Sequence, residues 1–170
     1  MILVVVAVIA SIAVGLAGAR GYLSGGFPGQ TLPAPTPQPP AATSCQGKGA
    51  AGAFSFGLIA GEAGRLTFNG TVPGPCFAVA VASTVVMHLY IDPGAGANHS
   101  WVLIPAAGSP TSLPVFPGAG FDTNVRFVGI GPGSYANFTF EAATVGNYWY
   151  ICEVPGHDDA GMHGWFLVTP

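Results

Sequence analysis

Alternation of hydrophobic and polar positions marks the chain from about residue 44 to its end. In the stretch 84–91, Val85, Met87 and Leu89 fall on one face of an extended strand, and the residues between them fall on the other. Similar short runs, bounded by Gly, Pro, Asn or Asp, predict strands at 53–58, 65–69, 76–81, 84–91, 100–104, 124–130, 134–140, 147–151 and 164–169. This pattern, with no helical periodicity between the runs, is typical of a β-sandwich or β-barrel. Aromatic side chains in and beside the strands, Phe127 among them, are predicted to fill its core.

The first 43 residues divide into two segments of a different kind. Residues 1–20 form an apolar segment that ends at Arg20, about the length of ~20 residues that crosses a bilayer. Positions 17–19, Ala-Gly-Ala, have the form of a signal-peptide cleavage site, but the apolar run is longer than the core of an ordinary signal peptide. Residues 21–43 are rich in Pro and Gly, which favours an extended linker. Because such a linker is useful only to an anchored domain, we favour a retained transmembrane anchor, followed by a domain at 44–170.

Composition excludes several classes of function. Charged residues make up only 6% of the chain, against roughly 25% in an average soluble domain. With four Lys and Arg in total, the chain cannot neutralise a phosphate backbone, so we expect no nucleic-acid partner. The 50% hydrophobic content argues against a disordered chain, and 26 Gly with 16 Pro argue against an all-helical one.

The densest group of metal-ligating side chains lies between the last two predicted strands. Cys152, His157 and Met162 recur at five-residue steps in the segment 152–162, CEVPGHDDAGM. Its Pro-Gly pair and Gly161 allow turns that fold the three side chains back toward one point. A thiolate, an imidazole and a thioether suit copper, and a second imidazole would complete the His₂Cys set with a weak axial Met that is typical of blue-copper electron-transfer sites.

Two upstream histidines could supply that second imidazole. His99 follows a Gly-rich turn and opens a predicted strand, whereas His88 lies in the middle of one. A ligand at a strand entrance can meet a loop at the end of a sandwich, so His99 is the preferred candidate. His163 is the alternative downstream ligand, but adjacent residues of a strand point to opposite faces, so only one of Met162 and His163 is expected to face the metal.

Three segments carry a resemblance to a known family. The segment 152–162 resembles the copper loop of sulfocyanins, which are membrane-associated cupredoxins, and 98–104, NHSWVLI, resembles their upstream ligand strand. The segment 68–75, FNGTVPGP, is similar to the opening of the first domain in multicopper oxidases and nitrite reductases. The resemblance implies a Greek-key β-sandwich, one type 1 copper ion and one-electron transfer. It also implies that His99, Cys152 and His157 are the strong copper ligands and that Met162 is the weak one.

These observations predict a monomeric electron carrier, not an enzyme, because four protein ligands leave no open position on the metal. Redox partners are expected to dock transiently around His157, with Glu153, Asp158 and Asp159 at the rim, on the outer side of a membrane. Three alternatives remain: a red-copper or nitrite-reductase-like catalytic domain, a copper chaperone or storage protein, and a metal-free structural sandwich. The spare cysteines Cys45 and Cys76 form either a disulfide, as in an extracytoplasmic protein, or two buried thiols.

Overall fold

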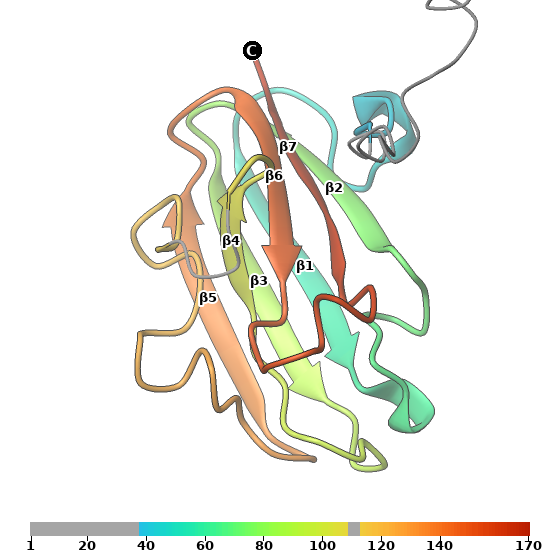
Figure 1. Ribbon diagram of the computed structural model, residues 1–170. Coiled ribbons are helices and arrows are strands. Elements are labelled where there is room, and N and C mark those ends of the chain that lie inside the picture. Colours follow the sequence, from blue (N-terminus) through green and yellow to red (C-terminus); the bar gives the residue numbers. More distant parts are fainter. Residues whose placement is uncertain (1–37, 109–112) are drawn as a thin grey trace, which may run out of the picture. The chain divides into compact units, whose positions relative to one another are not determined.

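Two stacked β-sheets form the part of the chain that the computed structural model describes, residues 38–108 and 113–170 (Figure 1). Its strands are β1 (Ala53–Ala60), β2 (Gly74–Ala80), β3 (Thr84–Ile91), β4 (Val102–Pro105), β5 (Tyr135–Glu141), β6 (Gly146–Ile151) and β7 (His163–Thr169). Two short 3₁₀ helices accompany them, η1 (Ala42–Ser44) and η2 (Glu62–Gly64).

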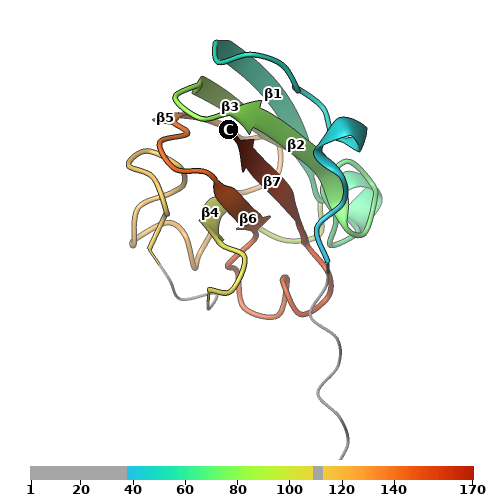
Figure 2. The same cartoon turned by 90° about the horizontal axis from the view of Figure 1, so that it is seen from above.

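One sheet has the strand order β1-β3-β5 and the other has the order β2-β7-β6-β4 (Figure 2). The pairs β1–β3 and β2–β7 are parallel, and the remaining pairs are antiparallel. Sequence neighbours β1 and β2, β2 and β3, and β3 and β4 lie in opposite sheets, so the chain crosses repeatedly from one layer to the other. The predicted all-β sandwich is confirmed.

The core lies between the sheets and follows the alternation seen in the sequence. In β3, Val85, Met87, Leu89 and Ile91 are all buried, and each apolar side chain of this size stabilises the fold by about 1.5–3 kcal/mol when it leaves water. The alternate positions of β3 face outward and are exposed or half-buried. The hydrophobic period of two therefore decides which face of this strand meets the opposite sheet.

Two of the predicted strands are wrong. Residues 65–69 contribute only isolated bridges at Phe68, and residues 123–128 form a helical turn, after which Ile130 makes an isolated bridge with His99. The turn begins where the Asp122 carboxylate accepts hydrogen bonds from the N–H groups of Asn124 and Val125, a capping interaction that competes with strand formation. Phe127 on this turn is 41% exposed, so its predicted place in the core is wrong as well.

A disulfide joins Cys45 to Cys76, with the two Cα atoms 4.7 Å apart. It attaches the segment after η1 to strand β2, and the N–H of Gln46 donates to the carbonyl oxygen of Cys76 beside it. Cys152 is left as a free thiol that is fully buried. The structure thus decides between the two alternatives that the sequence leaves open for Cys45 and Cys76.

The predicted anchor at 1–20 and most of the predicted linker at 21–43 lie outside the described residues. Among residues 38–108 and 113–170, no helix has the length and apolar character needed to span a membrane.

Several connections meet at one end of the sandwich. The chain that links β3 to β4 and the chain that links β6 to β7 both lie at the lower end in Figure 1. The first connection contains His99 and the second contains Cys152, His157 and Met162. The sheet topology therefore brings the candidate ligands from distant parts of the sequence to the same end.

Candidate metal centre

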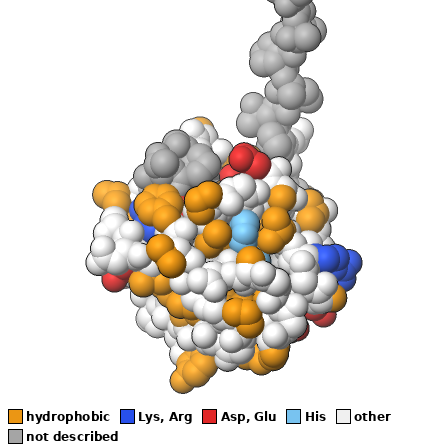
Figure 3. Space-filling view, turned by 60° about the horizontal axis from the view of Figure 1, so that its bottom comes forward, with side chains coloured by type: hydrophobic (Ala, Val, Ile, Leu, Met, Phe, Trp, Pro, Cys, Tyr) orange, Lys and Arg blue, Asp and Glu red, His pale blue; other side chains and the backbone are white. Residues whose placement is uncertain are grey.

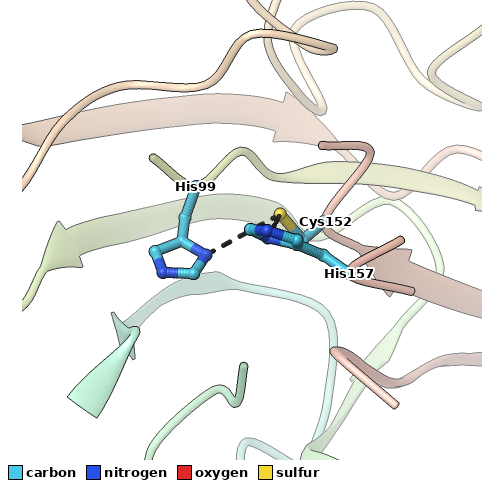
Figure 4. A group of neighbouring side chains, drawn as sticks. All are labelled: His99, Cys152 and His157. Atoms are coloured by element: carbon cyan, nitrogen blue, oxygen red, sulfur yellow. Dashed lines mark hydrogen bonds between the residues drawn. The ribbon is translucent and has the colours of Figure 1, made fainter. Parts of the chain in front are cut away.

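Three metal-ligating side chains converge at this end of the sandwich, with His99 and His157 both turned toward the sulfur of Cys152 (Figure 4). The Sγ of Cys152 lies 4.0 Å from Nδ1 of His99 and 3.4 Å from Nδ1 of His157. One ligand atom from each residue lies within 4.8 Å of the other two, and all three side chains are buried. The group contains His99, the histidine preferred from the sequence, and does not include His88.

The spacing of these atoms fits a single metal ion. First-row metals such as zinc bind sulfur at about 2.3 Å and imidazole nitrogen at about 2.0 Å, which separates the two ligand atoms by roughly 3.6–3.8 Å around one ion. The two sulfur–nitrogen separations in the structure, 4.0 Å and 3.4 Å, lie on either side of that range. The donor set, one thiolate and two imidazoles, is the one that trigonal copper sites use. The residues present therefore fit copper.

Backbone contacts hold His99 in place. Its N–H donates to the carbonyl oxygen of Ile130 at 3.0 Å, and the N–H of Ile130 donates back to the carbonyl oxygen of His99 at 2.9 Å. Gly61 packs against the ring, because a Cβ atom at that position would lie only 2.5 Å from Nε2 of His99. The ring is therefore held with Nε2 against Gly61 and Nδ1 toward Cys152.

The loop from Cys152 to Met162 folds back on itself as its turn residues predict. The N–H of His157 donates to the carbonyl oxygen of Val154, and the N–H of Gly161 donates to that of Asp158. Gly161 has a φ of 95°, a conformation that glycine adopts without steric cost. Met162 is fully buried, its N–H donates to the carbonyl oxygen of His157, and its carbonyl oxygen accepts from the N–H of Cys152. The loop is closed across its base, with Met162 directly beside Cys152 in the core.

Burial suits both imidazoles for metal binding. Desolvation, together with the charge of the neighbouring His157, lowers the pKa of His99 from 6.5 to about 4. Desolvation also lowers the pKa of His157. Since a metal binds the neutral ring, burial keeps both histidines available as ligands at a lower pH than an exposed histidine would be.

The Cys152 thiol responds to the same environment in the opposite direction. Desolvation raises its pKa, although hydrogen bonds from the N–H groups of Ser100 and Val154 and from the Ser100 hydroxyl oppose the change. The N–H of Ser100 lies 3.3 Å from the sulfur, and its Oγ lies 3.8 Å away. These donors are placed to stabilise a thiolate, so we expect the thiol to lose its proton to solvent when a metal ion takes its place on the sulfur.

The two remaining histidines lie outside this group. His88 projects from the exposed face of β3, where its ring nitrogens contact Ser55 Oγ at 2.9 Å and Asn137 Oδ1 at 2.7 Å. His163 stacks on Trp149 with the ring planes 5° apart, and its Nδ1 lies 2.8 Å from the Asp158 carboxylate. Met162 and His163 are thus directed to different surroundings, as expected of adjacent residues.

The structure contains a buried ion pair beside the ligand group that was not predicted from the sequence. Glu153 was expected at an exposed rim, but it is only 5% exposed and pairs with Arg126, which is 1% exposed. That expectation is wrong because the residue after Cys152 turns inward. No sequence pattern indicated this pair, because an arginine between Val125 and Phe127 occupies the ordinary outward-facing position of an alternating strand.

Comparison with known proteins identifies similar chains, although no family model matches this one. The chain is 32% identical over 91 residues to rusticyanin from Acidithiobacillus ferrooxidans, an alignment that covers 51% of this chain and 56% of that protein. It is 31% identical over 103 residues to auracyanin-B from Chloroflexus aurantiacus, covering 52% of this chain and 43% of that protein. The matched region therefore spans about half of each relative's length.

Solved structures share the same architecture. A copper nitrite reductase from Nitrosomonas europaea superimposes with a TM-score of 0.54 and 27% identity, over 69% of this chain and 42% of that one. A reduced auracyanin from Roseiflexus castenholzii superimposes with a TM-score of 0.51 and 22% identity, over 72% of this chain and the whole of that one. The sandwich is therefore a cupredoxin fold, and the sequence matches support the predicted relationship to type 1 copper cupredoxins.

Proposed function

We propose that the domain is a mononuclear blue-copper electron carrier. His99, Cys152 and His157 would be the strong ligands of one copper ion, and Met162 would be the weak axial ligand. The observation that carries the proposal is the convergence of two imidazole nitrogens on one buried thiol within 4.8 Å. The similarity to rusticyanin and auracyanin-B supports the same conclusion.

Copper bound in such a site would accept and release one electron at a time, without making or breaking bonds in a substrate. The chain supplies the remaining conditions. The buried rings of His99 and His157 present neutral nitrogens, and the hydrogen-bond donors around Cys152 stabilise its thiolate. The closed sandwich keeps water from the sulfur, and the loop bonds hold the ligands in one arrangement. Four protein ligands leave no position for a substrate, which favours a carrier over an enzyme.

Partners are proposed to dock on the loop end of the domain. This end presents a histidine among hydrophobic side chains and few charged ones (Figure 3). His157 is 7% exposed. Two apolar residues on connections at the same end are far more exposed, Val72 at 58% and Val128 at 63%. A small apolar surface of this kind suits a short-lived redox encounter. With the anchor predicted at 1–20, we place the monomeric carrier on the outer face of a membrane.

A catalytic copper domain would need additional histidines or an exchangeable ligand. The spare histidines have other neighbours: His88 contacts Ser55 and Asn137, and His163 contacts Asp158. The electron carrier is therefore the better supported function, and replacement of Met162 is the test that separates it from a site with an open position.

The proposal is tested by adding Cu(II) to the full-length chain and recording visible and EPR spectra. We expect an intense thiolate-to-copper absorption band and a narrow copper hyperfine splitting. Cys152→Ala and His99→Ala should abolish both signals, whereas Met162→Gln should retain copper and change the reduction potential.

His88→Ala is the matched control, because it removes a histidine that lies outside the cluster. It should leave the spectra unchanged. A colourless wild-type protein, or a blue band that persists in Cys152→Ala, would reject the copper site. A Met162→Gln variant with the wild-type potential would reject Met162 as a ligand.

A further inference from the structure

A two-pronged ion pair is buried directly beside Cys152. Nε of Arg126 donates to Oε2 of Glu153, and a terminal guanidinium nitrogen of Arg126 donates to Oε1. The side chains are 1% and 0% exposed. The whole chain has only four basic residues (Lys and Arg together) and seven acidic ones (Asp and Glu together). One basic and one acidic residue are nevertheless buried next to Cys152. Such a contact has a fixed planar geometry, which a simple charge attraction lacks.

Ser100 connects Glu153 with both Cys152 and His99. The N–H of Glu153 donates to the Ser100 hydroxyl at 2.9 Å, and the N–H of Ser100 lies 3.3 Å from the sulfur of Cys152. Ser100 directly follows His99 in the chain. The segment that carries Glu153 and the segment that carries His99 are therefore linked by buried hydrogen bonds on one side of the site.

Arg126 is connected to His99 from the other side. It lies in the helical turn in which the N–H of Arg126 donates to Asp122 and the N–H of Gly129 donates to Val125. Gly129 lies against the backbone of His99, because a Cβ atom there would be 2.7 Å from the carbonyl oxygen of that residue. The next residue, Ile130, exchanges two backbone hydrogen bonds with His99.

These contacts make a closed ring: His99 to Ser100, then to Glu153, then across the ion pair to Arg126, and back along the helical turn to His99. We propose that Arg126 and Glu153 are positioning residues that hold the His99 nitrogen at a fixed distance from the Cys152 sulfur. This inference rests on the proposed copper site and deepens it. In this proposal the ion pair acts through Ser100 and through the turn at 122–130.

Stability alone does not account for the pair. Removing two charges from water costs so much that an apolar pair of similar volume often stabilises a fold equally well or better. What an apolar pair lacks is direction, since it allows the two segments to slide against each other. A fixed ligand frame matters to an electron carrier, because the same four side chains must serve two oxidation states of the metal with little rearrangement.

The test replaces the pair by an apolar one, Arg126→Met/Glu153→Leu, in the full-length chain. The copper-free variant should remain folded, while the N–H groups of His99 and Ile130 should exchange with solvent at least about tenfold faster. The copper-loaded variant should have a wider hyperfine splitting and a changed reduction potential. Lys48→Gln/Glu141→Gln is the matched control, because it removes one cation and one anion from exposed positions and should change neither measurement.

Arg126→Lys is a second variant in case the double substitution does not fold. It keeps the charge but loses the two-pronged contact, so it should also speed exchange at His99 and Ile130. Wild-type exchange, spectrum and potential in the folded apolar variant would overturn the positioning role. A wild-type chain that binds no copper would instead overturn the proposed function, and the exchange rates of the copper-free protein would still decide whether the pair orders His99.

Discussion

Gly61 supports the His99 ring with its backbone alone. It has a φ of 78°, and a Cβ atom at this position would lie 2.5 Å from Nε2 of His99 and 2.6 Å from the side chain of Ala95. Gly61→Ala should therefore displace the His99 ring and weaken Cu(II) binding at least about tenfold, a loss of 1.4 kcal/mol in binding free energy. Titration of the copper-free protein with Cu(II), followed by the blue absorption, measures this change.

Gly133 offers a matched control for that substitution. Its φ of 76° is almost the same, and no atom lies within 4 Å of the place where a Cβ would be. Gly133→Ala should cost roughly 1–2 kcal/mol of stability through left-handed backbone strain and leave copper affinity unchanged. Equal copper affinities in the two variants would show that Gly61 does not position His99.

The buried histidines give the copper-free protein a definite pH dependence. His99 has a pKa of about 4 in the folded chain and about 6.5 when unfolded, so the unfolded chain binds the proton more readily between these values. The resulting stability is fully present above pH 6.5 and falls as the pH is lowered toward 4. The pKa of His157 is lowered as well and adds to the effect in the same direction.

Urea unfolding of the copper-free protein across this pH window measures the effect. His99→Asn should flatten the profile, whereas His88→Gln, which alters a histidine outside the cluster, should keep it. A wild-type stability that rises on acidification from pH 6.5 to 4 would contradict the burial of neutral histidines.

At the scale of elements, the disulfide stabilises the sandwich at a distance from the loop 152–162. Cys45 and Cys76 are 31 residues apart, and closing a loop of that size is worth about 3–4 kcal/mol in the chain-entropy model. The bridge packs with Trp165 and Leu167 in a cluster separate from the main core that contains Cys152 and Met162. Cys45→Ala/Cys76→Ala should therefore lose several kcal/mol in urea unfolding and keep the blue spectrum. A spectrum that changes with the bridge would show that the two clusters are coupled.

At the scale of the whole molecule, the scarcity of charge predicts encounters that depend little on salt. The chain has a formal net charge of −3, and Arg126 pairs internally with Glu153 beside the docking end. The electron self-exchange rate between two copies should change by less than about threefold from low to high ionic strength. NMR line broadening in mixtures of oxidised and reduced protein measures this rate.

Val128→Lys is the matched control for the salt dependence, since it places a cation on the docking end where an exposed apolar residue stands. Repulsion between two copies of the variant should slow self-exchange at low ionic strength. A wild-type rate that varies tenfold or more with salt would place the encounter on a charged surface and not on the loop end.

Local patterns in the sequence determined the features that depend on neighbouring residues. The alternation in 84–91 fixes which face of β3 is buried, and the Pro-Gly pair and Gly161 shape the loop that carries Cys152, His157 and Met162. Most of the strands were predictable for the same reason, because the direction of a side chain in a strand follows directly from its position.

Only the tertiary structure decided features that join distant segments. His99 and Cys152 are 53 residues apart, and their approach depends on how the two sheets stack, which no local pattern contains. Glu153 is buried against Arg126, and Arg126 lies in a helical turn that the Asp122 carboxylate caps where the apolar pattern indicates a strand. The types of the candidate ligands could therefore be predicted from the sequence. The contacts that hold them in place arise from packing between segments that are far apart in the sequence.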